Sequence, residues 1–105
     1  PTSIVSASDM TIQTSSPVNE NELRNYLQNL SIERSDLYEY QEENLVSIDH
    51  LGNPKSTIID SNRLKVLNEN MVKVIIWYDN EWGYSSRVVD IAQFVSNAKK
   101  KGFKI

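Results

Sequence analysis

The sequence contains no cysteine, one histidine, and only three glycines and three prolines among its 105 residues. Without cysteine the chain has no disulfide, no thiolate metal site and no cysteine nucleophile. Gly52, Gly83 and Gly102 lie too far apart to form the glycine-rich turn of a dinucleotide site or a phosphate loop. The residues therefore predict neither thiol chemistry nor a cradle for a nucleotide phosphate.

Long apolar runs and an excess of positive charge are also absent. The longest apolar stretch, around Val74–Tyr78, is much shorter than the roughly 20 residues of a membrane helix. The net charge of -3 argues against a nucleic-acid interface. The chain begins with Pro1, its first methionine is Met10, and no signal-like segment precedes either. We expect a piece of a larger, soluble, cytoplasmic protein that needs neither a membrane nor nucleic acid.

Residues 19–30 carry the start signal and the period of an amphipathic helix. Asn19 is placed as the N-cap, and Glu22 follows three residues later as its capping-box partner. Apolar residues then recur at helical spacing and form one stripe: Leu23, Tyr26, Leu27 and Leu30. The pattern predicts a helix of about three turns that packs on a sheet.

Short runs of β-branched and aromatic residues, separated by turn residues, predict that sheet. The expected strands are residues 4–12, 37–40, 45–49, 56–60, 64–67 and 71–78. A turn at Ser61-Asn62 would separate the fourth strand from the fifth. From residue 45 onward the connections between these strands are short, which favours antiparallel neighbours. Because the last strand is apolar on both faces, it is predicted to be a central strand covered on both sides.

After Asn80 the hydrophobic period changes from two to 3.6, which predicts a second helix. Its apolar stripe is Tyr84, Val88, Ile91, Val95 and Ala98. Lys99–Lys101 suit the C-terminal turn of this helix, with Gly102 as the C′ residue, and a patch for an anionic partner is the alternative. The elements together predict an α+β fold with an antiparallel or mixed sheet and two helices, one of them C-terminal.

Few residues suggest catalysis. His50 lies beside Asp49 and could act as a base or as half of a metal site. We expect the alternative, an exposed histidine at the end of a strand. The neighbouring Glu42 and Glu43 are interpreted as solvated charges rather than an acid/base pair.

The segment Trp77–Tyr84 surrounds an Asp-Asn-Glu core with large aromatic rings where a buried strand meets a helix. An asparagine amide both donates and accepts, so Asn80 could pair reciprocally with another carboxamide, such as that of nicotinamide. Alternatively, Asp79 or Asn80 caps the helix and the aromatic rings fill the core. The residue types by themselves leave both interpretations open.

The segment Met71–Asp90 resembles the C-terminal signature of phosphorylating glyceraldehyde-3-phosphate dehydrogenase. Residues 45–49, 52–54 and 56–60 are similar to consecutive strands of that family. The resemblance implies that residues 1–105 are the C-terminal portion of the family's catalytic domain, without its Rossmann domain. It places the nucleophile and the base outside this chain, so we expect no catalytic residue and no metal here. The chain by itself is expected to be inactive.

For the intact enzyme, the resemblance implies NAD-dependent oxidation and phosphorylation of a triose phosphate in glycolysis, through a cysteine thioester and with inorganic phosphate. It implies that Asn80 hydrogen-bonds the nicotinamide carboxamide, that Tyr84 closes the pocket beside it, and that Glu81 helps to fix the junction from behind. The last helix would pack on the nucleotide domain of the same subunit, within a homotetramer. The alternatives are a fragment of an erythrose-4-phosphate dehydrogenase and a non-catalytic interaction module derived from this fold.

Overall fold

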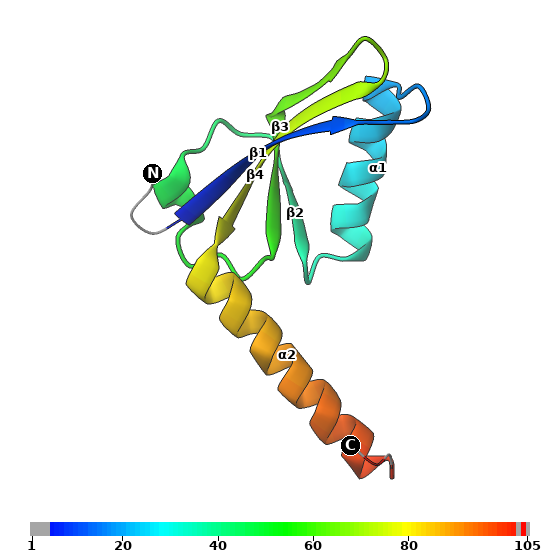
Figure 1. Ribbon diagram of the computed structural model, residues 1–105. Coiled ribbons are helices and arrows are strands. Elements are labelled where there is room, and N and C mark those ends of the chain that lie inside the picture. The colour runs from blue at the N-terminus through cyan, green and yellow to red at the C-terminus, as the bar shows by residue number, and fades with distance from the viewer. Residues whose placement is uncertain (1–4, 103, 105) are drawn as a thin grey trace.

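The computed structural model describes residues 5–102 and 104. Its elements are, in chain order, β1 (Val5–Gln13), α1 (Glu20–Glu33), β2 (Tyr38–Gln41), the short 3-10 helix η1 (Ser47–His50), β3 (Thr57–Leu67), β4 (Met71–Asp79) and α2 (Asn80–Lys100). The strands form one four-stranded sheet in the order β1-β4-β3-β2 (Figure 1). This confirms the predicted α+β class with a mixed sheet and a C-terminal second helix. Ile4, included in the first predicted strand, lies outside the described residues.

The sheet is antiparallel except at one edge. β4 is antiparallel to both of its neighbours, β1 and β3, as expected. β2 runs parallel to β3, and this pair makes the sheet mixed, as the predicted fold class allows. The connection from β2 to β3 covers residues 42–56, which is long enough for the crossover that a parallel pair requires.

β3 is a single strand, although the sequence predicted two strands and a turn at Ser61-Asn62. The register between β3 and β4 shifts between Asp60 and Lys65. Such an irregularity places extra residues in one strand and bends it without ending the ladder. Ser61 is consequently buried within the strand instead of lying in an exposed turn.

The strand predicted at residues 45–49 is wrong. That segment leads into η1, and its bonds are local: the Val46 amide donates to the Asp49 carboxylate at 2.8 Å, and the Asp49 amide donates to the Val46 carbonyl at 3.0 Å. An aspartate side chain that bonds nearby backbone in this way favours a turn over a sheet ladder. By contrast, the strand predicted near Leu37–Tyr40 is present as β2.

The prediction that His50 is exposed is also wrong. Only 2% of the residue is exposed, and its ring stacks on Trp77 with centroids 5.4 Å apart. η1 places the histidine on the sheet face that α1 does not cover. α1 therefore covers one face of β4, and η1 covers the other face near Trp77. β4 was predicted to be covered on both faces, and it is so only near Trp77, at the C-terminal end of the strand.

The hydrophobic core lies between α1 and the sheet. Asn19 caps α1 as predicted, accepting the Glu22 amide at 3.1 Å. Tyr26 was predicted to lie in the apolar stripe of this helix, but it lies at the edge of that stripe and is 64% exposed. The buried centre and the partly buried side chains packed on it are Ile59, Leu64 and Val74 with Leu23, Leu27, Tyr40 and Ile76.

α2 leaves the sheet and extends away from it, which gives the molecule dimensions of 52 × 35 × 20 Å (Figure 1). The helix ends as predicted, with Lys101 as the C-cap and Gly102 at a φ of 88°. Positive φ at C′ suits glycine because it has no Cβ. No helix among residues 5–102 is long and apolar enough to cross a membrane.

Candidate functional site

The segment Trp77–Tyr84 is the junction between β4 and α2. Asp79 is the last residue of β4 and the N-cap of α2, in extended conformation. Its Oδ1 accepts the amides of Glu81 and Trp82, both at 3.0 Å. The capping role left open between Asp79 and Asn80 therefore belongs to Asp79.

Asp79 also binds a distant loop. Its Oδ2 accepts the Gly52 amide at 3.0 Å, and the residue is only 2% exposed. The Gly52 amide lowers the pKa of the Asp79 carboxyl most strongly; burial opposes this effect, and the Trp82 and Glu81 amides add to it. A carboxylate held by these amides stays ionised and fixes the direction in which α2 leaves the sheet.

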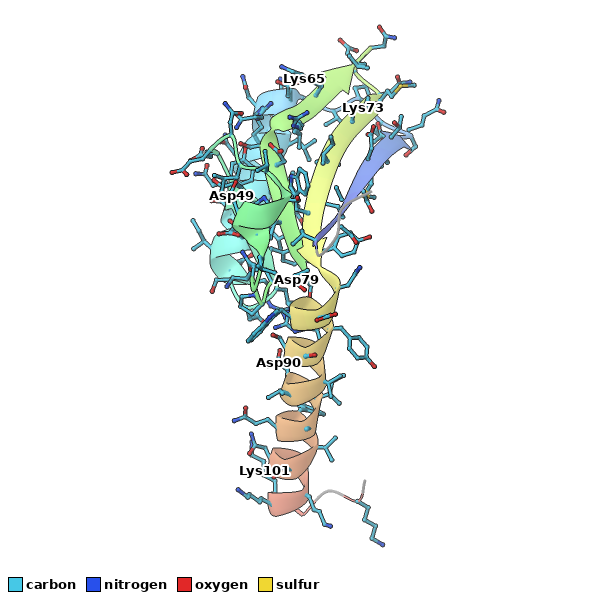
Figure 2. All side chains as sticks on the ribbon, turned by 90° about the vertical axis from the view of Figure 1, so that its left-hand side faces the viewer. Asp49, Lys65, Lys73, Asp79, Asp90 and Lys101 are labelled. Atoms are coloured by element: carbon cyan, nitrogen blue, oxygen red, sulfur yellow. The ribbon has the colours of Figure 1, made fainter. Side chains whose placement is uncertain are left out.

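The loop from Gly52 to Ser56 is held against the first two turns of α2 by further contacts. Gly83 is buried, and a Cβ built on it would lie 3.2 Å from the Lys55 carbonyl oxygen. Arg87 donates to the Ser56 hydroxyl and to the Asp90 carboxylate, both at 2.9 Å. The close approach at Gly83 leaves little space for any larger residue. Figure 2 shows Asp79 where the sheet and α2 meet, whereas Asp90 lies further along the helix.

Asn80 is the first residue of α2 and is exposed. Its Nδ2 donates to the Ser6 hydroxyl of β1 at 2.8 Å. Among the described residues, its Oδ1 has no hydrogen-bond partner. One end of the carboxamide is thus tied to the sheet, and the other end is free to accept a hydrogen bond from a ligand.

The three residues predicted for the cofactor site do not all lie together. Asn80 and Tyr84 are one helical turn apart and line the same open hollow of about 230 Å³. Ser56, Tyr78, Asp79, Gly83 and Arg87 complete its lining. Glu81 lines a separate hollow with Trp82 and Ser85, and its contribution to the junction is the amide that Asp79 accepts.

The aromatic residues of the junction fall into two groups. Trp77 and Tyr78 are half-buried, and Trp77 donates its indole N–H to the Asp60 carboxylate at 3.2 Å. Trp82 is 56% exposed and Tyr84 is 73% exposed. The interpretation that all these rings fill a core is therefore wrong for the two rings on α2.

Sequence reasoning missed several residues that shape this site: Ser6, Gly52, Ser56, Gly83 and Arg87. Arg87 lies within the recognised segment but carried no pattern of its own. Ser6 lies 74 residues before Asn80, and no spacing rule connects the two. The metal-site alternative for His50 has no further support, because no group of three or more His, Cys, Asp or Glu side chains gathers among residues 5–102.

The profile of the family described as Glyceraldehyde 3-phosphate dehydrogenase, C-terminal domain, matches residues 1–80 of this chain. The chain belongs to the glyceraldehyde-3-phosphate dehydrogenase family. The matched region ends at Asn80, the first residue of α2. The sheet and α1 of this glyceraldehyde-3-phosphate dehydrogenase domain thus lie inside the profile, and most of α2 follows it.

Individual relatives agree with this assignment. The chain is 43% identical over 93 residues to glyceraldehyde-3-phosphate dehydrogenase 2 of Staphylococcus aureus, a match that covers 89% of this chain and 27% of that protein. It is 50% identical over 64 residues to the chloroplastic glyceraldehyde-3-phosphate dehydrogenase of Chondrus crispus, covering 61% of this chain and 16% of that protein. The chain therefore spans about a quarter or less of the curated relatives that it matches.

Proposed function

We propose that residues 1–105 form the C-terminal portion of the catalytic domain of an NAD-dependent, phosphorylating glyceraldehyde-3-phosphate dehydrogenase. Their contribution is the β4–α2 junction, which orients the nicotinamide ring. The observation that carries this proposal is the Asn80 carboxamide, tied to Ser6 at 2.8 Å and sharing a hollow with Tyr84. A free amide oxygen beside an exposed aromatic ring fits a ring that carries a carboxamide.

The chemistry of the junction is orientation. NAD, when bound, accepts the hydride. Asn80 accepts a hydrogen bond from the nicotinamide amide and so selects the face of the ring that points to the substrate, while Tyr84 limits its sideways movement. Asp79 holds both residues at the start of α2 through the amides that it accepts. Orienting reactants in this way lowers the entropic part of the barrier without any group of the chain reacting.

The catalytic residues belong to the rest of the proposed subunit. Oxidation of a triose phosphate to an acyl phosphate through a thioester needs a cysteine, and this sequence has none. The 105 residues by themselves are therefore expected to be inactive. The proposal also includes inorganic phosphate as the second substrate, a glycolytic role in the cytoplasm, and assembly into a homotetramer.

The exposed apolar stripe of α2 supports a covering domain. Tyr84, Val88 and Ile91 are 73%, 47% and 63% exposed. Asn80 precedes Tyr84 by four residues and Ile91 by eleven, so it lies on the same side of the helix. A nucleotide domain that covers the stripe would bring its cofactor to Asn80. The alternative of a free-standing interaction module would favour charged residues at these positions.

The test is NAD reduction by the complete polypeptide that contains this chain, with glyceraldehyde 3-phosphate and erythrose 4-phosphate as substrates. We expect Asn80→Ala to weaken NAD binding by about three- to tenfold, because one hydrogen bond to the ring is lost. Asn97→Ala is the matched control, since it removes an exposed carboxamide further along α2. Equal NAD affinity and turnover in wild type and Asn80→Ala would contradict the proposed role.

A further inference from the structure

We propose that Gly83 is a positioning residue for the nicotinamide site. Because glycine has no side chain, α2 approaches the loop from Gly52 to Ser56 closely at this point. The approach fixes the place of Tyr84, the next residue of the helix, and of Asn80 in the preceding turn. The inference rests on the proposed function of the junction and extends it to a residue that acts through its neighbours.

Three contacts at helical spacing hold one face of α2 against this loop. They are the Asp79 carboxylate with the Gly52 amide at 3.0 Å, Gly83 with the Lys55 carbonyl, and the Arg87 guanidinium with the Ser56 hydroxyl at 2.9 Å. A guanidinium can only donate, so the Ser56 oxygen accepts and the direction of that bond is fixed. Residues four apart lie on one side of a helix, and the three contacts together therefore fix the rotation of α2 about its axis.

Gly83 does not serve the helix itself. Glycine inside a helix is destabilising relative to alanine, because it loses more backbone freedom on folding. Its φ is not positive, unlike those of Gly52 and Gly102, so the backbone conformation at this position suits alanine as well. What requires glycine is the loop, since a Cβ here would lie 3.2 Å from the Lys55 carbonyl oxygen. The residue therefore serves the approach of α2 to the loop and not the stability of the helix.

This approach matters for the proposed site because the two share one hollow. Gly83, Arg87 and Ser56 line the open hollow of about 230 Å³ together with Asn80 and Tyr84. A methyl group on Gly83 would separate α2 and the loop by a few tenths of an ångström, and Tyr84 would move with the helix. Hydride transfer needs well-oriented reactants, so a small displacement of the groups that orient the ring slows it.

The experiment compares Gly83→Ala with wild type in the complete polypeptide. It measures the rate of hydride transfer to NAD in a single turnover, which separates this step from product release. It also measures the affinity for ADP-ribose, which lacks the nicotinamide ring. For Gly83→Ala we expect hydride transfer to slow by about three- to tenfold, while ADP-ribose affinity stays unchanged. A merely structural role would instead lower the melting temperature and leave the rate unchanged.

Arg87→Ala is the second variant, and it takes over the test if Gly83→Ala does not fold. It removes the bond to Ser56 and loosens the same contact one turn later, so hydride transfer should also slow with ADP-ribose affinity unchanged. Ser56→Ala should match it, and the double variant should be no slower than either, because both changes remove one bond. The matched control is Ser85→Ala, which places alanine on the opposite, exposed side of α2 and should change neither quantity.

The outcomes separate the two proposals. An unchanged rate of hydride transfer in either the Gly83 or the Arg87 variant, or a loss of ADP-ribose affinity as large as the loss of rate, would overturn the positioning role and leave the proposed function standing. A wild-type protein that reduces no NAD, or an Asn80→Ala variant that behaves like wild type, would overturn the proposed function and this inference with it.

Discussion

The two helices contact the sheet in different ways. α1 lies along one face, with Leu23 and Leu27 packed on the buried core, and its Arg24 donates to the carbonyls of Ser61 and Leu64 at 2.7 and 2.6 Å. α2 contacts the rest of the chain mainly through its first two turns. Its only buried residue is Gly83, and Figure 2 shows Asp90 and Lys101 progressively further from the sheet.

This difference separates what holds the domain together from what carries its proposed function. α1 completes the core. It also bonds the part of β3 that extends beyond the end of β2, where Arg24 donates to the Ser61 carbonyl and Glu20 accepts the Val66 amide. α2 adds little to that core. Its apolar stripe is available to another domain, while its first residues are fixed by Asp79. The position of α2 is thus fixed at its N-terminal end, while most of its length does not pack on the sheet.

The largest effect should come from the core under α1. Leu64 is fully buried, and Leu64→Ala should lower the free energy of unfolding by about 2 to 5 kcal/mol because it leaves a cavity. Ile91→Ala on α2 should change it by less than about 0.5 kcal/mol in the 105-residue chain, since Ile91 is 63% exposed. Urea unfolding measures both. A similar loss of unfolding free energy in the two variants would contradict the conclusion that the core under α1, and not α2, stabilises the domain.

The next effect should come from the junction. Asp79→Ala removes the cap of α2 and the bond to Gly52, and should cost about 2 to 4 kcal/mol at neutral pH. Asp79→Asn should cost less, because its oxygen can still cap the helix while its NH2 group faces the Gly52 amide. Thermal melting of the three proteins would rank them. Equal stability of the asparagine and alanine variants would show that the Gly52 bond, and not the cap, dominates.

The contribution of Asp79 should also depend on pH. The pKa of this carboxyl is lowered in the folded protein, chiefly by the Gly52 amide. Its stabilising effect is therefore fully present above the unfolded-state pKa, near about 4, and is lost as the pH falls through the folded-state pKa. The stability difference between wild type and Asp79→Asn should shrink below about pH 4. A difference that stays constant down to acid unfolding would contradict this.

A smaller effect is expected where α1 supports β3. Arg24→Ala should cost about 1 to 3 kcal/mol, because the carbonyls of Ser61 and Leu64 lose a charged donor. The control is Arg34→Ala. It breaks an exposed pair with Asp36 at 3.0 Å and should change stability much less than Arg24→Ala does. Chemical denaturation of both variants distinguishes a structural arginine from a surface one.

The smallest predicted effect is a gain. The Nε2 atom of His50 is buried without a hydrogen-bond partner among the described residues, while the ring stacks on Trp77. His50→Phe keeps the stacking and removes the unpaired atom, so it should raise the free energy of unfolding by about 1 kcal/mol. His50→Gln, which keeps a polar group and loses the ring, should lower it. A destabilised phenylalanine variant would mean that the imidazole has a partner.

Local chemistry explains which elements were predictable. The cap of α1, the glycine after α2 and the bounds of β4 follow from residues within a few positions of one another, so the sequence predicted them. The resemblance likewise led to Asn80 and Tyr84. The turn predicted at Ser61-Asn62 was wrong because pairing with β4 continues β3 through these residues. The strand predicted at residues 45–49 was wrong because the Asp49 side chain bonds the Val46 amide and favours a turn.

By itself the sequence determined the two helices, most of the strands, the family and the segment that forms the junction. Periodicity, caps and a recognisable motif are all properties of neighbouring residues. Only the tertiary structure decided that β2 runs parallel to β3, that His50 is buried, and that α2 extends away from the sheet instead of packing on it. It also brought Ser6 to Asn80 and Gly52 to Asp79. These contacts join residues far apart in the chain, where sheet register and burial, rather than local preference, determine which groups meet.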